Sequence, residues 1–286
     1  IHTGSKVEAG EVALLVKNGV LTNNSTDLKA NFLGYAGSAG KLINNANLTV
    51  EETGFYAKSG EIENNGIITA NNNEVIFFYS DNAKITNNTD ITGLGVGNIG
   101  IYGVDSVIDN LGNIAVSDSE INSTTNSKLN KYAVGIYGKN SQITNIGNIT
   151  VGENAIGIYA NKGNVINTGN ITVTGDRAIG IYGNIGTTIT NSGIITANGT
   201  GALGIVLSQG TTLNNAVNGT MIINGITSGN YESAVGTVYP TPSIINSGVI
   251  KVSEKFETDG INVIIKVDPS TVQAPTTSEI TSTGYD

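Results

Sequence analysis

The chain has 286 residues and a formal net charge of −9, with 38% hydrophobic and only 13% charged side chains. It is therefore too apolar for a disordered acidic tail and too weakly charged for a coiled coil. Because its Lys and Arg residues are scattered and outnumbered by acids, no nucleic-acid partner is expected.

Neither cysteine nor a run of 18 apolar residues occurs in the chain, so no disulfide and no membrane-spanning helix is expected. The chain begins Ile1-His2-Thr3, with no signal peptide. We therefore expect any targeting or anchor segment to lie outside it.

A unit of about 23 residues repeats along the chain. The clearest copies begin at Gly135, Gly157 and Gly180 and read G-I-Y-[GA], then a polar turn, then I-x-N-x-G-x-I-x-V. Weaker copies begin at Ala13, Leu33, Gly54, Phe77, Gly100, Gly204 and Gly236. Start-to-start spacings lie between 20 and 24 residues, except for 35 after Gly100 and 32 after Gly204.

Alignment of the ten copies produces columns of one residue type. One column is asparagine throughout: Asn23, Asn44, Asn64, Asn87, Asn110, Asn145, Asn167, Asn191, Asn215 and Asn246. Aliphatic columns lie two residues before it and four and six residues after it, as in Ile143, Ile149 and Val151. A tyrosine column comprises Tyr35, Tyr56, Tyr79, Tyr102, Tyr137, Tyr159 and Tyr182.

Within each copy, apolar β-branched residues alternate with polar ones, which indicates strands of three to five residues separated by Asn/Gly turns. Three such strands fill one coil. The sequence therefore predicts an all-β fold, a right-handed parallel β-helix of about ten coils and roughly 50 Å in length. Aliphatic columns would fill its interior, and the asparagines would form amide ladders at turns, where left-handed backbone angles suit them.

The periodicity also predicts the organisation of the chain. Residues 1–12 are expected to be the N-terminal edge, 13–267 the β-helix repeats, and 268–286 a C-terminal edge or flexible tail. The two long spacings predict insertions at Ser117–Asn130 and Asn224–Tyr231, whose Ser, Thr, Asn and Gly residues do not continue the columns. Both are expected to loop out from the rod.

The N-x-G-x-I and G-I-Y-[GA] units resemble the passenger domains of type V autotransporters, over about residues 13–267. Their Asn/Lys/Ile-rich character is most similar to the large fusobacterial outer-membrane autotransporter adhesins. The resemblance implies a cell-surface or extracellular location through a C-terminal β-barrel that this sequence does not contain. Adhesins, self-associating factors, toxins and proteases all occur in that family.

Residue chemistry disfavours an enzyme. His2 is the single histidine, so a Ser-His-Asp or Cys-His centre and a histidine zinc site are not expected. Carboxylates such as Asp105 and Asp109 do not recur as a cluster, although a polysaccharide-cleaving β-helix stays an alternative. Gly95–Gly100 matches G-x-G-x-x-G, but a strand follows it where a dinucleotide site needs a helix. No catalytic residue, metal or cofactor is therefore expected.

We expect a non-enzymatic adhesin or structural passenger, or alternatively a pure spacer within a longer autotransporter. Partners would be a protein or glycan on a host cell or another bacterium, and self-association is possible in principle. If the isoleucines of G-I-Y point inward, the tyrosines point outward and form a surface stripe. The expected binding residues are Tyr102, Tyr137, Tyr159, Tyr182, Tyr231 and Tyr239. A stacked ladder that only covers the sheet is the alternative for this column.

Overall fold

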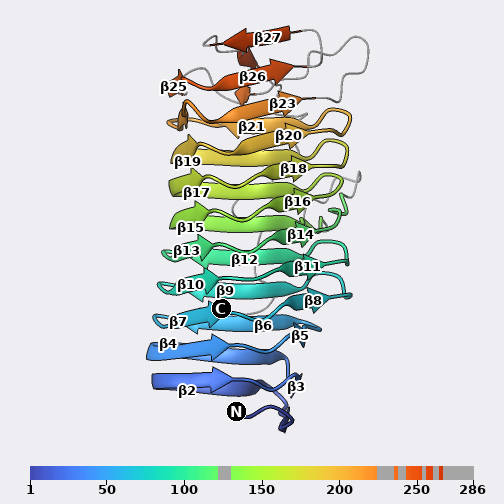
Figure 1. Ribbon diagram of the computed structural model, residues 1–286, viewed down its shortest axis with the longest axis vertical. Helices are drawn as coiled ribbons and strands as arrows, with labels where there is room; N and C mark the ends of the chain where they lie inside the picture. The colour runs from blue at the N-terminus through green and yellow to red at the C-terminus, as the bar shows by residue number, and fades with distance from the viewer. Residues whose placement is uncertain (122–129, 224–234, 238–242, 253–255, 260–263, 267–286) are drawn as a thin grey trace.

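The computed structural model describes residues 1–121, 130–223, 235–237, 243–252, 256–259 and 264–266. All regular elements in these residues are strands, and they stack as a right-handed parallel β-helix of about nine turns (Figure 1). This confirms the predicted fold class. The described residues include no helix that could cross a membrane.

Each full coil has three faces, as the three strands per repeat predicted. The first, which we call the tyrosine face, carries the G-I-Y segment. Its short strands are β6 (Thr53–Lys58), β9 (Ile76–Asp81), β12 (Ile99–Val104), β21 (Leu203–Leu207), β24 (Val235–Thr237) and β28 (Ile264–Lys266). In other coils one long strand bends through a corner onto the next face: β2 (Val12–Asn23), β4 (Phe32–Asn44), β15 (Val134–Asn145), β17 (Ile156–Asn167) and β19 (Ile179–Asn191).

The second face, the asparagine face, contains the C-terminal halves of those long strands. Its separate strands are β7 (Glu61–Asn64), β10 (Lys84–Asn87), β13 (Val107–Asn110), β22 (Thr212–Asn215) and β25 (Ser243–Asn246). Because the long strands join them, the tyrosine and asparagine faces form one 16-stranded sheet.

The third face forms a separate 10-stranded sheet. Its strands are β5 (Leu48–Thr49), β8 (Ile68–Ala70), β11 (Ile91–Gly93), β14 (Ile114–Val116), β16 (Ile149–Val151), β18 (Ile171–Val173), β20 (Ile194–Ala197), β23 (Thr220–Ile223), β26 (Val249–Val252) and β27 (Phe256–Asp259). At the N-terminal end β1 (Lys6–Glu8) pairs with β3 (Asp27–Lys29). At the other end β27 pairs antiparallel with β26, which departs from the parallel repeat.

The strand register confirms the columns read from the sequence. In β15, β17 and β19, for example, Tyr137 pairs with Tyr159 and Tyr159 with Tyr182. One copy is displaced: Gly236 pairs with Val206, so it occupies the tyrosine position and not the first position of its repeat. Because this copy matches the G-I-Y pattern poorly, its register was not predicted correctly from the sequence.

Two consecutive residues point inward at the start of the tyrosine face. Phe77 and Phe78 are both fully buried in the main core, although neighbours on a regular strand face opposite sides. In the clearest repeats a glycine holds the first of these positions. A Cβ on Gly135 would lie 2.5 Å from the carbonyl oxygen of Gly157 in the next coil, which explains why glycine recurs there. This double inward step turns the following tyrosine outward.

The asparagine column forms a buried amide ladder. Each Nδ2 donates to the Oδ1 of the asparagine in the next coil at 2.8–2.9 Å, from Asn23 through to Asn215. Most also donate to a backbone carbonyl two residues ahead, as Asn145 does to Gly147 at 2.9 Å. The predicted left-handed angles at these asparagines are wrong, because the ladder residues end strands and have no positive φ.

Candidate functional site

The tyrosine column runs along the outer side of the tyrosine face as one continuous aromatic ladder. Ring centroids of neighbouring tyrosines lie 4.4–5.3 Å apart from Tyr35 to Tyr182. This spacing follows from the rise between coils, roughly 4.8 Å. The predicted outward direction is correct, because the preceding isoleucines Ile101, Ile136, Ile158 and Ile181 lie in the main core.

The predicted exposure of this column is wrong for four of the six expected binding residues. Tyr102 and Tyr182 are 7% and 8% exposed, and Tyr137 and Tyr159 are 0% exposed. The rings form a second apolar cluster outside the coil interior. Most of its aliphatic members come from the position three residues before the tyrosine position, which Val206 occupies in the coil of Leu203: Ile76, Ile99, Val134, Ile156, Ile179 and Leu203.

The base of the first insertion packs against this second cluster. Ile121 and Tyr132 belong to it, and the backbones of Glu120 and Lys131 exchange two hydrogen bonds of 2.9 Å. The insertion was expected to loop out from the rod, but its described base contacts the tyrosine face. Residues 122–129 and the second insertion at 224–231 lie outside the described residues. So do Tyr231 and Tyr239.

The two ends of the tyrosine column differ in ring geometry and burial. From Tyr79 to Tyr182 neighbouring rings are stacked, with interplanar angles of 1–15°. Between Tyr35, Tyr56 and Tyr79 the angles are 77° and 73°, so these pairs are edge-to-face. Tyr35, Tyr56 and Tyr79 are only half-buried, and Leu15, in the preceding coil, is 52% exposed. The column is thus an open strip at its N-terminal end.

Burial shifts the acidity of these phenols. Desolvation, with a smaller contribution from Tyr79, raises the pKa of Tyr56 to about 12. Desolvation also raises the pKa of Tyr102 and of Tyr137 well above the ordinary value, and the neighbouring phenols Tyr137 and Tyr159, respectively, raise them further. All are neutral phenols at physiological pH, so the column offers aromatic and not anionic chemistry.

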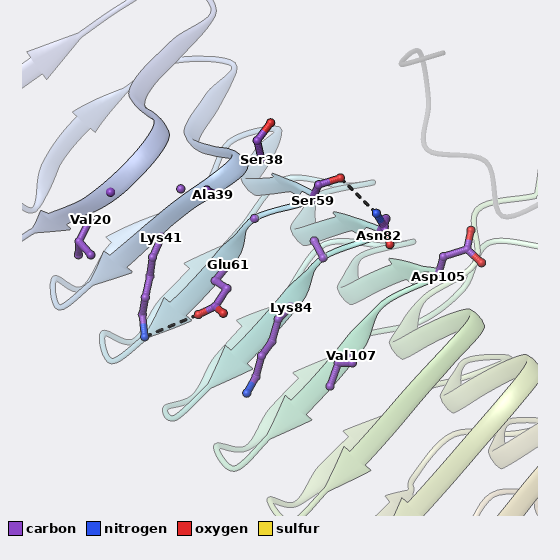
Figure 2. A pocket seen from close by; sticks show the side chains of 14 residues that line it. Val20, Ser38, Ala39, Lys41, Ser59, Glu61, Asn82, Lys84, Asp105 and Val107 are labelled. Carbon is purple, nitrogen blue, oxygen red and sulfur yellow. Dashed lines mark hydrogen bonds and ion pairs between the residues drawn. The ribbon is translucent and has the colours of Figure 1, made fainter.

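A shallow groove of about 540 Å³ lies on the same N-terminal coils, at the corner between the tyrosine and asparagine faces (Figure 2). The corner turns of four successive coils line the groove with one residue each. These residues, Ser38, Ser59, Asn82 and Asp105, have left-handed φ angles of 36–55°. Small residues make up part of its lining: Gly19, Ala39, Gly40, Gly60 and Ala83. The sequence analysis did not predict this groove. A small residue directly before a charged one in three successive repeats, at Gly40-Lys41, Gly60-Glu61 and Ala83-Lys84, could have indicated it.

The charges beside the groove are paired. Lys41 lies 2.7 Å from Glu63 and 3.9 Å from Glu61, and Lys84 lies 3.3 Å from Asp109. The hydrogen bond from Lys41 holds the pKa of Glu63 below its ordinary value. In the described residues no group of three or more His, Cys, Asp or Glu side chains is placed to hold a metal ion. The groove therefore presents hydroxyls, amides and paired charges.

Comparison with known proteins identifies the family. The family described as BigA third pectate lyase-like domain matches residues 6–194. No curated protein and no solved structure matches the chain. BigA is an autotransporter-type adhesin, and the match supports a pectate-lyase-like β-helix passenger domain; the fusobacterial likeness stays a prediction. On the evidence of two thirds of its length and of its solenoid fold, the chain belongs to the BigA third pectate lyase-like domain family.

Proposed function

We propose that the chain is a non-enzymatic passenger segment at the bacterial surface, and that its N-terminal coils present a binding surface to a protein or glycan of a host cell or another bacterium. The family match supports the surface passenger. The rigid stack of coils supports projection of a surface away from the cell. The proposed class of partner rests on the partly exposed tyrosines and the polar groove of these coils.

The open strip of tyrosines is the observation that carries the binding proposal. Tyr35, Tyr56 and Tyr79 keep part of their rings exposed, whereas Tyr137 and Tyr159 have none to offer a ligand. Partly exposed tyrosines contribute a large contact area and a hydroxyl at low cost in side-chain entropy. The binding surface is therefore placed on the first four coils, and not along the whole column.

The groove supports the same location and a non-enzymatic role. It runs along the coils that bear the open tyrosines, and its hydroxyl and amide groups suit a polar partner. Glycoside cleavage needs two carboxyl groups free to act as acid and base or nucleophile. Beside the groove, Glu63 and Asp109 are each engaged by a lysine. Asp105 accepts a hydrogen bond from Asn140 at 3.0 Å.

A binding screen with matched variants tests this proposal. The purified chain would be applied to glycan arrays, cultured host cells and partner bacteria, beside a Tyr35→Ser/Tyr56→Ser variant. A Leu94→Ser/Val217→Ser variant is the control, since it removes equally apolar residues, 65% and 75% exposed, from elsewhere on the rod. We expect the tyrosine variant to lose binding by about tenfold or more, and the control to bind like the parent.

Two results would contradict the proposal. If neither the parent nor the control bound any glycan, host cell or bacterium, the chain would be a spacer. Full binding by a folded Tyr35→Ser/Tyr56→Ser variant would place the contact elsewhere on the molecule.

A further inference from the structure

The open tyrosines are the most easily oxidised side chains on the surface of the described residues. The chain has no Cys, no Trp and one Met, and Met221 is 0% exposed. Tyr35, Tyr56 and Tyr79 are partly exposed. The other tyrosines of the described residues are at most 8% exposed: Tyr102, Tyr132, Tyr137, Tyr159 and Tyr182. A one-electron oxidant that reaches these coils therefore meets the three open phenols first.

These three phenols lie next to one another in neighbouring strands. Tyr35 pairs with Tyr56 in β4 and β6, and Tyr56 pairs with Tyr79 in β6 and β9. Their ring centroids are 5.3 Å and 4.8 Å apart, respectively. In two phenols joined by a C–C bond between the carbons beside their hydroxyls, ordinary bond lengths place the centroids roughly 4.3 Å apart. Tyr56 and Tyr79, the closer pair, are thus near the separation of a coupled product.

Partial exposure gives the open rings room to couple. The coupled rings are joined through their edges, so each ring must pivot sideways out of the column. Solvent borders Tyr56 and leaves it this room. Tyr137 and Tyr159 are 0% exposed and stacked against neighbours on both sides, and close packing opposes such a movement. Coupling is therefore expected in the open strip and not in the buried stack.

Oxidation of a phenol releases its proton, and the open strip has a group that accepts it. After desolvation and Tyr79, the charge of Asp81 contributes to the raised pKa of Tyr56. Asp81 ends β9, and its side chain is about one-third exposed, with Lys58 Nζ 3.7 Å from the carboxylate. A proton from Tyr56 can pass through this carboxylate to water. The described structure thus provides contact, room and a proton acceptor at one place.

We propose that Tyr56 and Tyr79 form a site of oxidative cross-linking, at which a one-electron oxidant such as a peroxidase with hydrogen peroxide joins two neighbouring coils through a dityrosine bond. Each phenol loses one electron and one proton and becomes a phenoxyl radical. The two radicals form a C–C bond between carbons beside their oxygens. The hydrogen on each of these carbons then moves to an oxygen, which restores both phenols. The two electrons and two protons convert one hydrogen peroxide into two water molecules.

The bond would fasten β6 to β9 covalently, within the coils that carry the open strip. Photo-oxidation of the purified full chain by tris(bipyridine)ruthenium, with persulfate as the electron acceptor, tests the proposal. Dityrosine fluorescence measures the yield. Trypsin applied after denaturation cuts behind Lys58, so the two tyrosines fall in the separate peptides 42–58 and 59–84, and mass spectrometry identifies their linked pair.

Two variants that keep the aromatic ring sharpen this test. Tyr56→Phe removes the phenol that touches both open neighbours. Tyr137→Phe is the matched control, because it removes a phenol from the buried stack. Circular dichroism before oxidation confirms that both variants are folded.

We expect linked peptides 42–58 and 59–84 from the parent and the control, and a dityrosine yield at least about tenfold lower from Tyr56→Phe, because coupling needs two phenols held together. The yield per chain should not change when the protein is diluted about tenfold, as for any reaction within one molecule. An undiminished yield from Tyr56→Phe, links only between other tyrosines, or a yield that falls with dilution would each overturn the proposal. Partner binding is measured without oxidant, so it stands or fails separately.

Discussion

The coils before Val134 and the coils from Val134 onward are built from the same repeat but present different surfaces. In the first set Tyr35, Tyr56 and Tyr79 are half-buried, Tyr56 packs edge-to-face against both of its neighbours, and the asparagine face carries paired charges. In the second set the tyrosines are stacked and buried, and the asparagine face is uncharged. A repeat therefore specifies the coil, while the residues between its columns specify what each coil offers to partners.

The largest difference is expected when a tyrosine is truncated in each region. Replacing Tyr159 by alanine leaves a cavity between Tyr137 and Tyr182 and should lower the free energy of unfolding by about 3–5 kcal/mol. The same change at Tyr56 should cost about 1–2 kcal/mol, because that ring is only half-buried. Urea unfolding of both variants measures the difference. Equal losses would show that the two parts of the column are packed alike.

The amide ladders supply a second contrast. Asn145 is fully buried and bonds to Asn110 and Asn167 at 2.8 Å, so Asn145→Leu should destabilise the rod by about 3 kcal/mol. Asn65 belongs to an exposed ladder with Asn45 and Asn88, and Asn65→Leu should cost under about 1 kcal/mol. Thermal unfolding compares the two variants. An Asn145→Leu protein as stable as its parent would contradict a structural role for the buried ladder.

Alkaline pH should separate the open tyrosines from the buried ones. Because the folded pKa of Tyr56 is raised to about 12 above an ordinary value near 10, folding favours the protonated phenol. Its contribution to stability is complete below pH 10 and is lost as the pH rises from 10 to 12. Tyr102 and Tyr137, whose pKa values are raised further, should ionise only as the rod unfolds.

Absorbance at the tyrosinate band, followed together with circular dichroism, measures this titration. A Tyr56→Phe variant should lose one phenol from the part of the absorbance change near pH 12, while its circular dichroism stays that of the parent. Ionisation of every tyrosine before any loss of structure would contradict the buried packing of Tyr102 and Tyr137.

The smallest effect is expected at the paired charges of the first coils. Lys41→Gln removes the contacts to Glu61 and Glu63, but these side chains are about one-third to one-half exposed. The loss of stability should be about 0.5 kcal/mol and should disappear at high salt. Unfolding of this variant in low and high salt provides the measurement. A loss above about 2 kcal/mol would mean that the pair supports the groove more strongly than its exposure suggests.

The sequence by itself determined the repeat, the fold class and the positions that face the core. Columns of asparagine, aliphatic residues and tyrosine at intervals near 23 residues admit one consistent reading, because only stacked coils bring such positions together. The buried amide ladder followed from the same columns. The side of the strand on which each of these side chains lies could also be predicted. Ile136 points inward and Tyr137 outward, as alternation along a strand requires.

Only the tertiary structure decided which outward residues are exposed. Alternation distinguishes inside from outside within one coil, but it contains no information about what packs on the outer side. Tyr137 is buried because other outward residues and the base of the first insertion gather over that part of the column. The groove likewise arises where small residues of several coils meet at one corner. Both depend on contacts between residues far apart in the chain, which a local pattern cannot express.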